Sequence, residues 1–174
     1  MSTKYERELV GILRGDPKVV RKASRSMDLI TKGKFNKILN DPFLVLRAAG
    51  SLGVDLAALR GDISFPIEVK SSIKKKVYLN SDQLKKQAEK MIDVCRRTGV
   101  IPLYAYRYKN VRGDSWRMFT LPIEGLVARN RILYGTIPTV TVSSGGNYVL
   151  EWEKGMPLSA LIDYLDYRGK GKQA

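Results

Sequence analysis

The sequence contains no histidine and a single cysteine, Cys95. Without histidine, neither histidine-based acid–base catalysis nor a histidine metal ligand is available. One cysteine excludes an intrachain disulfide and makes a thiolate zinc site implausible. Any metal ion that this chain binds must therefore be a hard cation held by oxygen ligands.

Long apolar runs are also missing. No run approaches the roughly 18 apolar residues needed to cross a bilayer, and the initial segment MSTKYERELV lacks the apolar core of a signal peptide. We therefore expect a cytoplasmic, nucleoid-associated protein, or one in the infected cell if the source is a virus, with no membrane partner.

Acidic residues are scarce relative to basic ones. Lysine and arginine number 31 against 17 aspartates and glutamates, which gives a formal charge of +14. A surface this positive attracts polyanions, and nucleic acid is the first candidate. The alternative is a highly charged protein from a salt- or heat-adapted source. The hydrophobic fraction of 44% in 174 residues is typical of a folded chain, and we expect one domain over residues 1–174.

Helical patterning dominates the beginning of the chain and returns near residue 80. Asp16 is a suitable N-cap for a helix that starts at Pro17. Ser81 and Gly99 bound the clearest helix, and Cys95 lies in its apolar stripe, which makes that thiol a core residue rather than a nucleophile. We expect helices at 3–14, 17–30, 34–40, 80–99 and 157–167, followed by a frayed, flexible tail at 168–174.

Short apolar runs bounded by Gly or Pro indicate strands in the middle of the chain. We expect strands at 43–48, 54–59, 63–70, 100–108 and 115–121, with weaker pieces at 137–142 and 147–152. Pro66 predicts that its strand lies at an edge or carries a bulge. The order of the elements predicts an α/β domain with a central mixed sheet flanked by helices.

The stretch VDLAALRGDISFPIEVK (54–70) places two carboxylates inside apolar, strand-like runs, where an unpaired charge is costly. A two-residue hairpin turn at 61–62 would put Asp55 directly across from Glu68. Lys70, two residues after Glu68, would point to the same face of the sheet. The hairpin therefore predicts a patch of two carboxylates and one ammonium.

Two like charges opposed across a sheet destabilise it unless a cation compensates them. Mg²⁺ prefers oxygen ligands and is typically held by one or two carboxylates together with substrate phosphate. Such an ion polarises a phosphoryl oxygen, and Lys70 could position the attacking water or neutralise growing charge. These residues suffice for phosphodiester hydrolysis. The alternative is a plain cross-strand salt-bridge cluster, because the D…E-x-K pattern is short.

Three longer stretches carry a resemblance: YERELVGIL, then LRAAGSLGVDLAALRGDISFPIEVK, then VYLNSDQLKKQAEKMIDVCRRTGVIPLYAYRYKNVRGDSWRMFTL. Together they resemble the archaeal-type Holliday junction resolvases, which belong to the PD-(D/E)xK, restriction-endonuclease-like nucleases. The likeness covers residues 5–14 and 43–121. It implies a restriction-endonuclease-like core and a structure-selective endonuclease that resolves four-way DNA junctions.

The resemblance implies a role for each residue of the hairpin patch. Asp55, Glu68 and the carbonyl of Val69 would hold Mg²⁺, with Mn²⁺ as a substitute, and Lys70 would be the catalytic lysine. Glu6 matches an N-terminal acidic residue that assists near the metal.

Further positions match residues that meet DNA. Arg7 and Arg47 would contact the backbone, and Ser51 would lie near the scissile phosphate, within both the catalytic and the DNA-binding sets. Family members are homodimers that nick opposed strands, which suits a junction with two symmetry-related phosphates. The segment SSIKKK, with Lys74, Lys75 and Lys76, is placed to grip phosphates near the cut; the alternative is a solvated loop.

One departure from the family pattern is large. Residues 15–40 insert one or two basic helices between the first helix and the R-x-A-G-S strand, and these would extend the DNA surface or remodel the dimer. The insertion leaves open whether Glu6 or Glu8 is the active-site acid. The sequence also leaves open whether one or two metal ions bind, and whether a sliding clamp or a helicase docks on the protein.

Two other functions remain at this point. A related PD-(D/E)xK nuclease would act on flaps, replication forks or plain duplex, and would not prefer a four-way junction over linear DNA. A non-catalytic basic DNA-binding protein would bind with a steep salt dependence and would release no product in Mg²⁺.

Overall fold

The computed structural model describes residues 4–48, 53–61 and 63–170. Its main sheet has six strands in the order β1-β2-β3-β5-β6-β9, and a smaller sheet has the order β4-β8-β7. The strands are β1 (Leu44–Arg47), β2 (Leu56–Arg60), β3 (Ile63–Ser72), β4 (Lys76–Leu79), β5 (Leu103–Tyr108), β6 (Trp116–Thr120), β7 (Thr141–Val142), β8 (Tyr148–Glu151) and β9 (Met156–Pro157). In the main sheet β3 and β5 pair in parallel and the other neighbours are antiparallel, so the predicted mixed sheet is confirmed.

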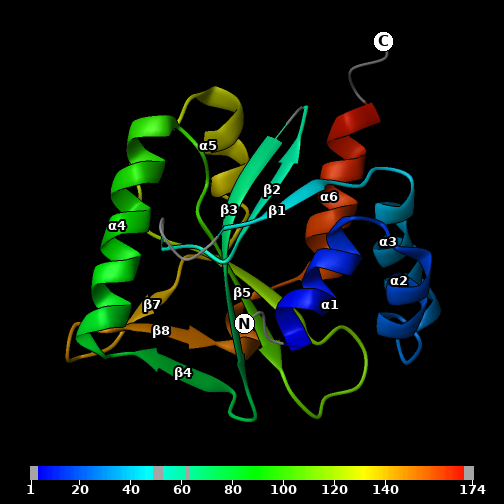
Figure 1. Ribbon diagram of the computed structural model, residues 1–174, viewed down its shortest axis with the longest axis horizontal. Coiled ribbons are helices and arrows are strands. Elements are labelled where there is room, and N and C mark those ends of the chain that lie inside the picture. The colour runs from blue at the N-terminus through cyan, green and yellow to red at the C-terminus, as the bar shows by residue number, and fades with distance from the viewer. Residues whose placement is uncertain (1–3, 49–52, 62, 171–174) are drawn as a thin grey trace.

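Helices cover both faces of the main sheet (Figure 1). They are α1 (Lys4–Leu13), α2 (Pro17–Ala23), α3 (Leu29–Asn36), the 3₁₀ turn η1 (Lys37–Leu39), α4 (Asp82–Thr98), α5 (Ala128–Tyr134), the 3₁₀ turn η2 (Trp152–Lys154) and α6 (Leu158–Lys170). In Figure 1 α4 stands on one side of the sheet, while α1 and α6 stand on the other. None of the helices that the structure describes is long and apolar enough to span a membrane.

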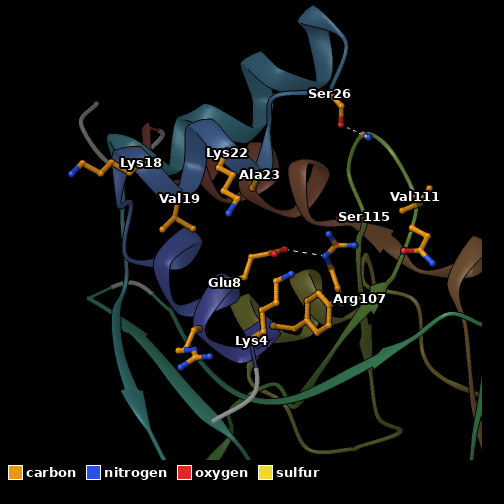
Figure 2. A pocket seen from close by; sticks show the side chains of 14 residues that line it. Lys4, Glu8, Lys18, Val19, Lys22, Ala23, Ser26, Arg107, Val111 and Ser115 are labelled. Carbon is orange, nitrogen blue, oxygen red and sulfur yellow. Dashed lines mark hydrogen bonds and ion pairs between the residues drawn. The ribbon is translucent and has the colours of Figure 1, made fainter.

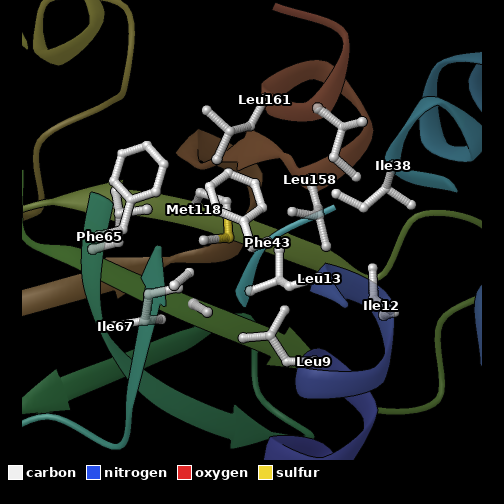
Figure 3. Close-up of a cluster of buried hydrophobic side chains, with 14 of the residues drawn as sticks. Leu9, Ile12, Leu13, Ile38, Phe43, Phe65, Ile67, Met118, Leu158 and Leu161 are labelled. Carbon is white, nitrogen blue, oxygen red and sulfur yellow. The ribbon is translucent and has the colours of Figure 1, made fainter. Parts of the chain in front are cut away.

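The core under α1 and α6 is apolar throughout. Figure 3 shows Leu9 and Leu13 of α1 and Leu158 and Leu161 of α6 meeting the sheet around Ile67, and all five are buried. Because alternate residues of a strand point to opposite faces of the sheet, Glu68 must point to the face opposite Ile67. The packing of α1 and α6 therefore decides which face carries the carboxylate.

The core on the opposite face is formed by α4 against β5 and β6. Ala88, Met91 and Cys95 pack against Tyr104 and Tyr106, and all five are buried. Burial raises the pKa of the Cys95 thiol to about 12, which leaves it protonated and unreactive. The prediction that Cys95 is a core residue is confirmed. The predicted caps at the two ends of its helix are also confirmed. Ser81 Oγ accepts a hydrogen bond from the Leu84 N–H at the beginning, and Gly99 adopts the left-handed conformation at the end.

The insertion folds as separate short helices rather than as one helix from 17 to 30. Asp16 caps α2 as predicted, but Asp28 caps a new helix, α3, and the intervening residues form a turn. Ile30, at the end of the expected helix, belongs to α3 and is 75% exposed. The first helix does not continue to residue 30 because Asp28 acts as a second N-cap. Asp28 Oδ1 accepts a hydrogen bond from the Thr31 N–H, which starts a new helix.

The insertion is anchored to the last helix. α3 and η1 pack against α6, and Lys37 Nζ lies 2.6 Å from Asp163 Oδ1 and 3.2 Å from Asp166 Oδ2. α6 continues to Lys170, so the backbone of residues 168–170, expected to fray, is helical. Residues 171–174 of the expected tail lie outside the described residues.

The expectation that Pro66 marks an edge strand or a bulge is wrong, because the pairing of β3 with β2 runs through Pro66 without an extra residue. β3 lies in the middle of the sheet, between β2 and β5. Pro66 pairs with Ala57 on the β2 side, whereas pairing with β5 begins only at Ile67. The strand tolerates proline because no β5 residue is paired at the position where an N–H is missing.

Candidate active site

The hairpin register predicted from the turn is confirmed between Leu56 and Ile67, whereas the predicted pair of Asp55 with Glu68 is not part of this ladder. Arg60 pairs with Ile63 and Leu56 pairs with Ile67 in an antiparallel ladder. This ladder ends one position before Asp55, whose N–H donates to the Ile67 carbonyl at 3.0 Å. Asp55 is thus held at the start of β2, beside the centre of β3.

The Asp55 side chain crosses to the neighbouring strand. Its Oδ2 accepts a hydrogen bond from the Val69 N–H at 2.8 Å. This contact fixes one carboxylate oxygen against β3, between the positions of Glu68 and Lys70. Within the described ranges, the other oxygen, Oδ1, has no hydrogen bond or ion pair.

Glu68 is the most unusual residue of the site, because its carboxylate is buried with only 3% of the residue exposed. Lys70 Nζ donates to Glu68 Oε1 at 2.6 Å, which confirms that the two share a face. Glu68 Oε2 is buried and has no hydrogen-bond partner within the described part of the chain. An unsatisfied buried carboxylate oxygen is costly and calls for a compensating group.

The electrostatics follow from this burial. Loss of solvent raises the pKa of Glu68 from 4.5 to about 7, and the nearby Asp55 charge raises it further, while Lys70 and, more weakly, Gln87 oppose the shift. Burial, followed by the charges of Glu68 and Asp55, also raises the pKa of Tyr104. The site therefore carries excess negative charge that its single lysine does not balance.

Tyr104 adds a second unsatisfied atom to the same region. It pairs with Glu68 in the parallel β3–β5 register, so the two side chains are neighbours on one face. Its hydroxyl is buried and, like Glu68 Oε2, makes no hydrogen bond to the described residues. Two polar atoms on adjacent strands that lack a hydrogen-bond partner mark a position for a group that the described residues do not supply.

α4 closes the site from above the sheet. Gly53, with φ of 71°, brings the chain entering β2 against Gln87 of α4. A Cβ at Gly53 would lie 3.3 Å from both Gln87 Cγ and the Gln87 carbonyl oxygen. Only glycine fits this approach without strain. Gln87 and Tyr104 were not predicted from the sequence, since neither lies in the hairpin motif and only tertiary packing brings them to it.

The two N-terminal acids lie on α1 and not on the hairpin, and a role of Glu6 near the metal ion stays a prediction. Among the described residues no group of three or more acidic, cysteine or histidine side chains is placed to hold a metal ion. Glu6 is in the first turn of α1, and Leu9 and Leu13 of the same helix pack on the sheet around Ile67. Glu8 accepts from Arg107 Nε and from Trp116 Nε1, both at 2.9 Å, so Glu8 is a structural residue.

The expected DNA-contacting residues are dispersed. Arg7 is exposed on α1, and Arg47 is exposed at the end of β1, beside Leu56 in register. Ser51 lies outside the described residues. Arg7 and Arg47 lie on different elements, and contact of either residue with DNA stays a prediction.

The lysine run after β3 is partly structural. Lys75 pairs with Glu153, and Lys76 Nζ lies 3.3 Å from Glu151 Oε1. The expected loop is in part a strand, since residues 76–79 form β4 and pair with β8. Lys74 alone of the three lysines has no ion pair in the portion that the structure describes.

The donor set fits a hard divalent cation. Asp55 Oδ1 and the orphaned Glu68 Oε2 are carboxylate oxygens on adjacent chain segments, and the Val69 carbonyl lies between Glu68 and Lys70 in sequence. Oxygen ligands of this kind suit Mg²⁺ or Mn²⁺. Asp55, Glu68 and Val69 are therefore the residues that would hold the ion.

A mixed sheet with a carboxylate at the start of β2 and an E-x-K pair on β3 is the arrangement of the restriction-endonuclease-like nucleases. The family model of the archaeal Holliday junction resolvase (Hjc) matches residues 34–167. The chain belongs to this family. The match includes the whole hairpin and extends beyond the region of the sequence resemblance to α6, but it begins after α1 and α2.

A solved structure also matches the chain. It is the 1.6 Å structure of Hjc from Archaeoglobus fulgidus, a Holliday junction resolvase from an archaeal hyperthermophile. The two share 19% identity over 69% of this chain and 81% of that chain, with a TM-score of 0.46.

Proposed function

We propose that the protein is a Mg²⁺-dependent endonuclease that cleaves four-way DNA junctions as a homodimer. The observation that carries the proposal is the buried Glu68 carboxylate, joined to Lys70 and coupled to Asp55, in a member of the resolvase family. The formal charge of +14 supports DNA as the substrate.

The chain's own residues have distinct parts in this reaction. A bound divalent cation supplies a Lewis acid for the phosphoryl group and lowers the pKa of an attacking water. The hydrogen bond from the Val69 N–H holds the Asp55 carboxylate in one orientation, so no reorganisation is needed when substrate binds. Lys70 Nζ, with 20% of its side chain exposed, is placed to donate to a phosphate oxygen that reaches this face.

Homodimer formation is supported by an uncovered apolar face at the edge of the sheet. Leu44 and Leu46 on β1 are 63% and 49% exposed, whereas Val45 between them is buried. Ala57 and Leu59 are their partners on β2, and both are only half-buried. An exposed apolar edge strand is a natural site for association with a second copy.

The direct test is incubation of a labelled four-way junction with and without Mg²⁺, with the products resolved by strand. Glu68→Gln and Lys70→Ala should abolish cleavage and leave junction binding intact. Glu153→Gln, which removes an exposed carboxylate in a surface ion pair, is the matched control and should cleave normally. Undiminished cleavage by either hairpin variant would exclude this site.

The same assay separates junction resolution from a broader nuclease activity. Linear duplex, flap and fork substrates are compared with the junction at moderate salt. Preferential, paired nicking of the junction supports the proposal. Equal cleavage of all four substrates would favour the related nuclease that acts on flaps, forks or duplex.

A further inference from the structure

A groove of about 630 Å³ lies where α1, α2 and the β5–β6 loop meet. Figure 2 shows Lys4, Lys18 and Lys22 around this groove, with Glu8 and Arg107 joined across its floor. Arg7 also lines it. The groove is on the α1 face of the sheet, whereas Glu68 and Lys70 are on the α4 face. It is therefore separate from the candidate active site.

The groove is strongly positive. Four of its lining cations, Lys4, Arg7, Lys18 and Lys22, have no ion pair within the described part of the chain. Its single carboxylate, Glu8, is already engaged by Arg107 and Trp116. Like charges gathered in one concave place repel each other, and an anion with several negative groups relieves that repulsion.

The walls of the groove are held in place by specific contacts. The Gly113 N–H donates to Ser26 Oγ at 2.9 Å, which joins the β5–β6 loop to the turn after α2 (Figure 2). The Tyr5 ring has Lys4, Arg107 and Lys109 within 5.7, 5.4 and 5.3 Å of its centre. These contacts hold cations from α1 and β5 together on one surface before any ligand binds.

The groove lies at the end of the sheet to which the active-site strand leads. Arg107 pairs in register with Ser71, the residue after Lys70. A polyanion that extends past Lys70 at this end of β3 would reach the groove by turning round the end of the sheet. Lys4, Arg7, Lys18 and Lys22 all precede residue 34, where the family match begins, so this surface is supplied by segments outside that match.

We propose that this groove binds the phosphodiester backbone of a DNA arm, so that the inserted helix α2 extends the DNA-binding surface beyond the active site. The assignment of the polyanion as DNA rests on the proposed function. Four unpaired cations in one groove match a backbone that carries one negative charge per nucleotide. Contacts of this kind fix the position of the nucleic acid and do not read its sequence.

The test uses two charge-reversal pairs on α2 and the turn after it. Lys18 and Lys22 line the groove, whereas Arg21 and Arg25 have the same spacing, are also exposed and do not line it. Lys18→Glu/Lys22→Glu and Arg21→Glu/Arg25→Glu therefore change net charge equally. Binding of a labelled four-way junction and of a linear duplex is measured in EDTA over a range of salt concentrations.

The groove pair should weaken binding of both DNAs by about tenfold or more, and should reduce the slope of log affinity against log salt by roughly 0.9 per lost phosphate contact. The control pair should have a clearly smaller effect. Lys18→Gln/Lys22→Gln, which introduces no new repulsion, should reproduce the slope change. Equal weakening by the two charge-reversal pairs would overturn the proposal, because net charge alone would then explain binding.

Cleavage in Mg²⁺ is read separately from binding. If the wild-type protein binds DNA through the groove but cleaves no junction, the proposed function fails and the groove assignment stands. If it cleaves junctions and the groove pair binds DNA normally, the groove assignment fails and the proposed function stands.

Discussion

Lys70 Nζ lies 2.6 Å from one oxygen of Glu68, while the other oxygen of the same carboxylate is buried with no hydrogen-bond partner among the described residues. The lysine thus hydrogen-bonds only one of the two oxygens of the buried carboxylate. Burial of the carboxylate disfavours its ionised form, and this raises the pKa of Glu68 to about 7. This asymmetry has consequences for stability that do not depend on DNA.

The first prediction concerns stability against pH in metal-free protein. Glu68 has a native pKa above its unfolded value of 4.5, so the native state retains its proton over a range in which the unfolded state has lost it. Stability contributed by this group therefore falls as the pH rises from about 4.5 to about 7. Relative to wild type, Glu68→Gln should gain up to roughly 3 kcal/mol across this window.

Urea unfolding in EDTA at pH 4.5 and pH 8 measures this gain. Glu151→Gln is the control with the opposite sign, because Lys154 and Lys76 lower the pKa of Glu151 and its ionised form stabilises the fold. A stability difference between Glu68→Gln and wild type that is constant over this range would show that Glu68 does not titrate there.

The second prediction concerns the metal ion. A ligand that binds only the native state stabilises it by about 2.7 kcal/mol at one hundred times its Kd. For a chain of this length we expect the Tm of the wild-type protein to rise by about 5–10 °C in saturating Mg²⁺ or Mn²⁺. Asp55→Asn and Glu68→Gln should lose most of this rise.

The measurement is the Tm of each protein in Mg²⁺ or Mn²⁺ compared with its Tm in EDTA, at constant ionic strength. Glu153→Gln should keep the full rise in Tm, because Glu153 is an exposed surface acid. A rise of equal size in all four proteins would place the cation elsewhere.

The hairpin could be predicted from the sequence because its determinants are local. A two-residue turn fixes the register, and the alternation of side chains then assigns Glu68 and Lys70 to one face. The helix from Asp82 to Thr98 could be predicted equally well, because a capping serine precedes it and a left-handed glycine follows it.

What could not be predicted depends on contacts between distant segments. β4 is a strand because it pairs with β8, about seventy residues away, although the lysine run that leads into it and ends at Lys76 indicates a loop. The N-cap of α5 is Val127, which makes no side-chain cap hydrogen bond, so the sequence carries no capping signal for this helix. Gln87 reaches the site only because Gly53 allows close contact with α4.

The third prediction tests that close contact. Gly53→Ala must place a side chain at φ of 71° and a Cβ 3.3 Å from the Gln87 backbone oxygen. The backbone conformation costs about 1 kcal/mol, and the contact with Gln87 adds to this cost. Because α4 then shifts relative to Asp55, cleavage of the junction should fall as well.

Gly99→Ala is the matched control, because Gly99 has the same φ of 71° but open space where its Cβ would lie. Unfolding free energies and single-turnover cleavage rates of the two variants are compared. Gly53→Ala should lose more stability and more activity than Gly99→Ala. Identical losses would mean that backbone strain, not contact with α4, makes glycine necessary at Gly53.

The fourth prediction tests whether the exposed β1 face forms the dimer. Leu44 and Leu46 present apolar surface at the edge of the sheet, and association with a second copy would remove that surface from water. Leu44→Glu/Leu46→Glu should dissociate the dimer, as measured by light scattering. Leu29→Glu/Ile30→Glu, at two even more exposed positions on α3 (88% and 75%), should not.

Dimer formation also determines the cleavage product, because two active sites at a fixed separation are needed to nick opposed strands together. On a supercoiled plasmid that extrudes a cruciform, the wild-type protein should give mainly linear product. The Leu44→Glu/Leu46→Glu monomer should give nicked circles, since each site then acts alone. A monomeric variant that still linearises the plasmid would show that paired cleavage does not require this interface, and a control that also dissociates would show that β1 is not specific for assembly.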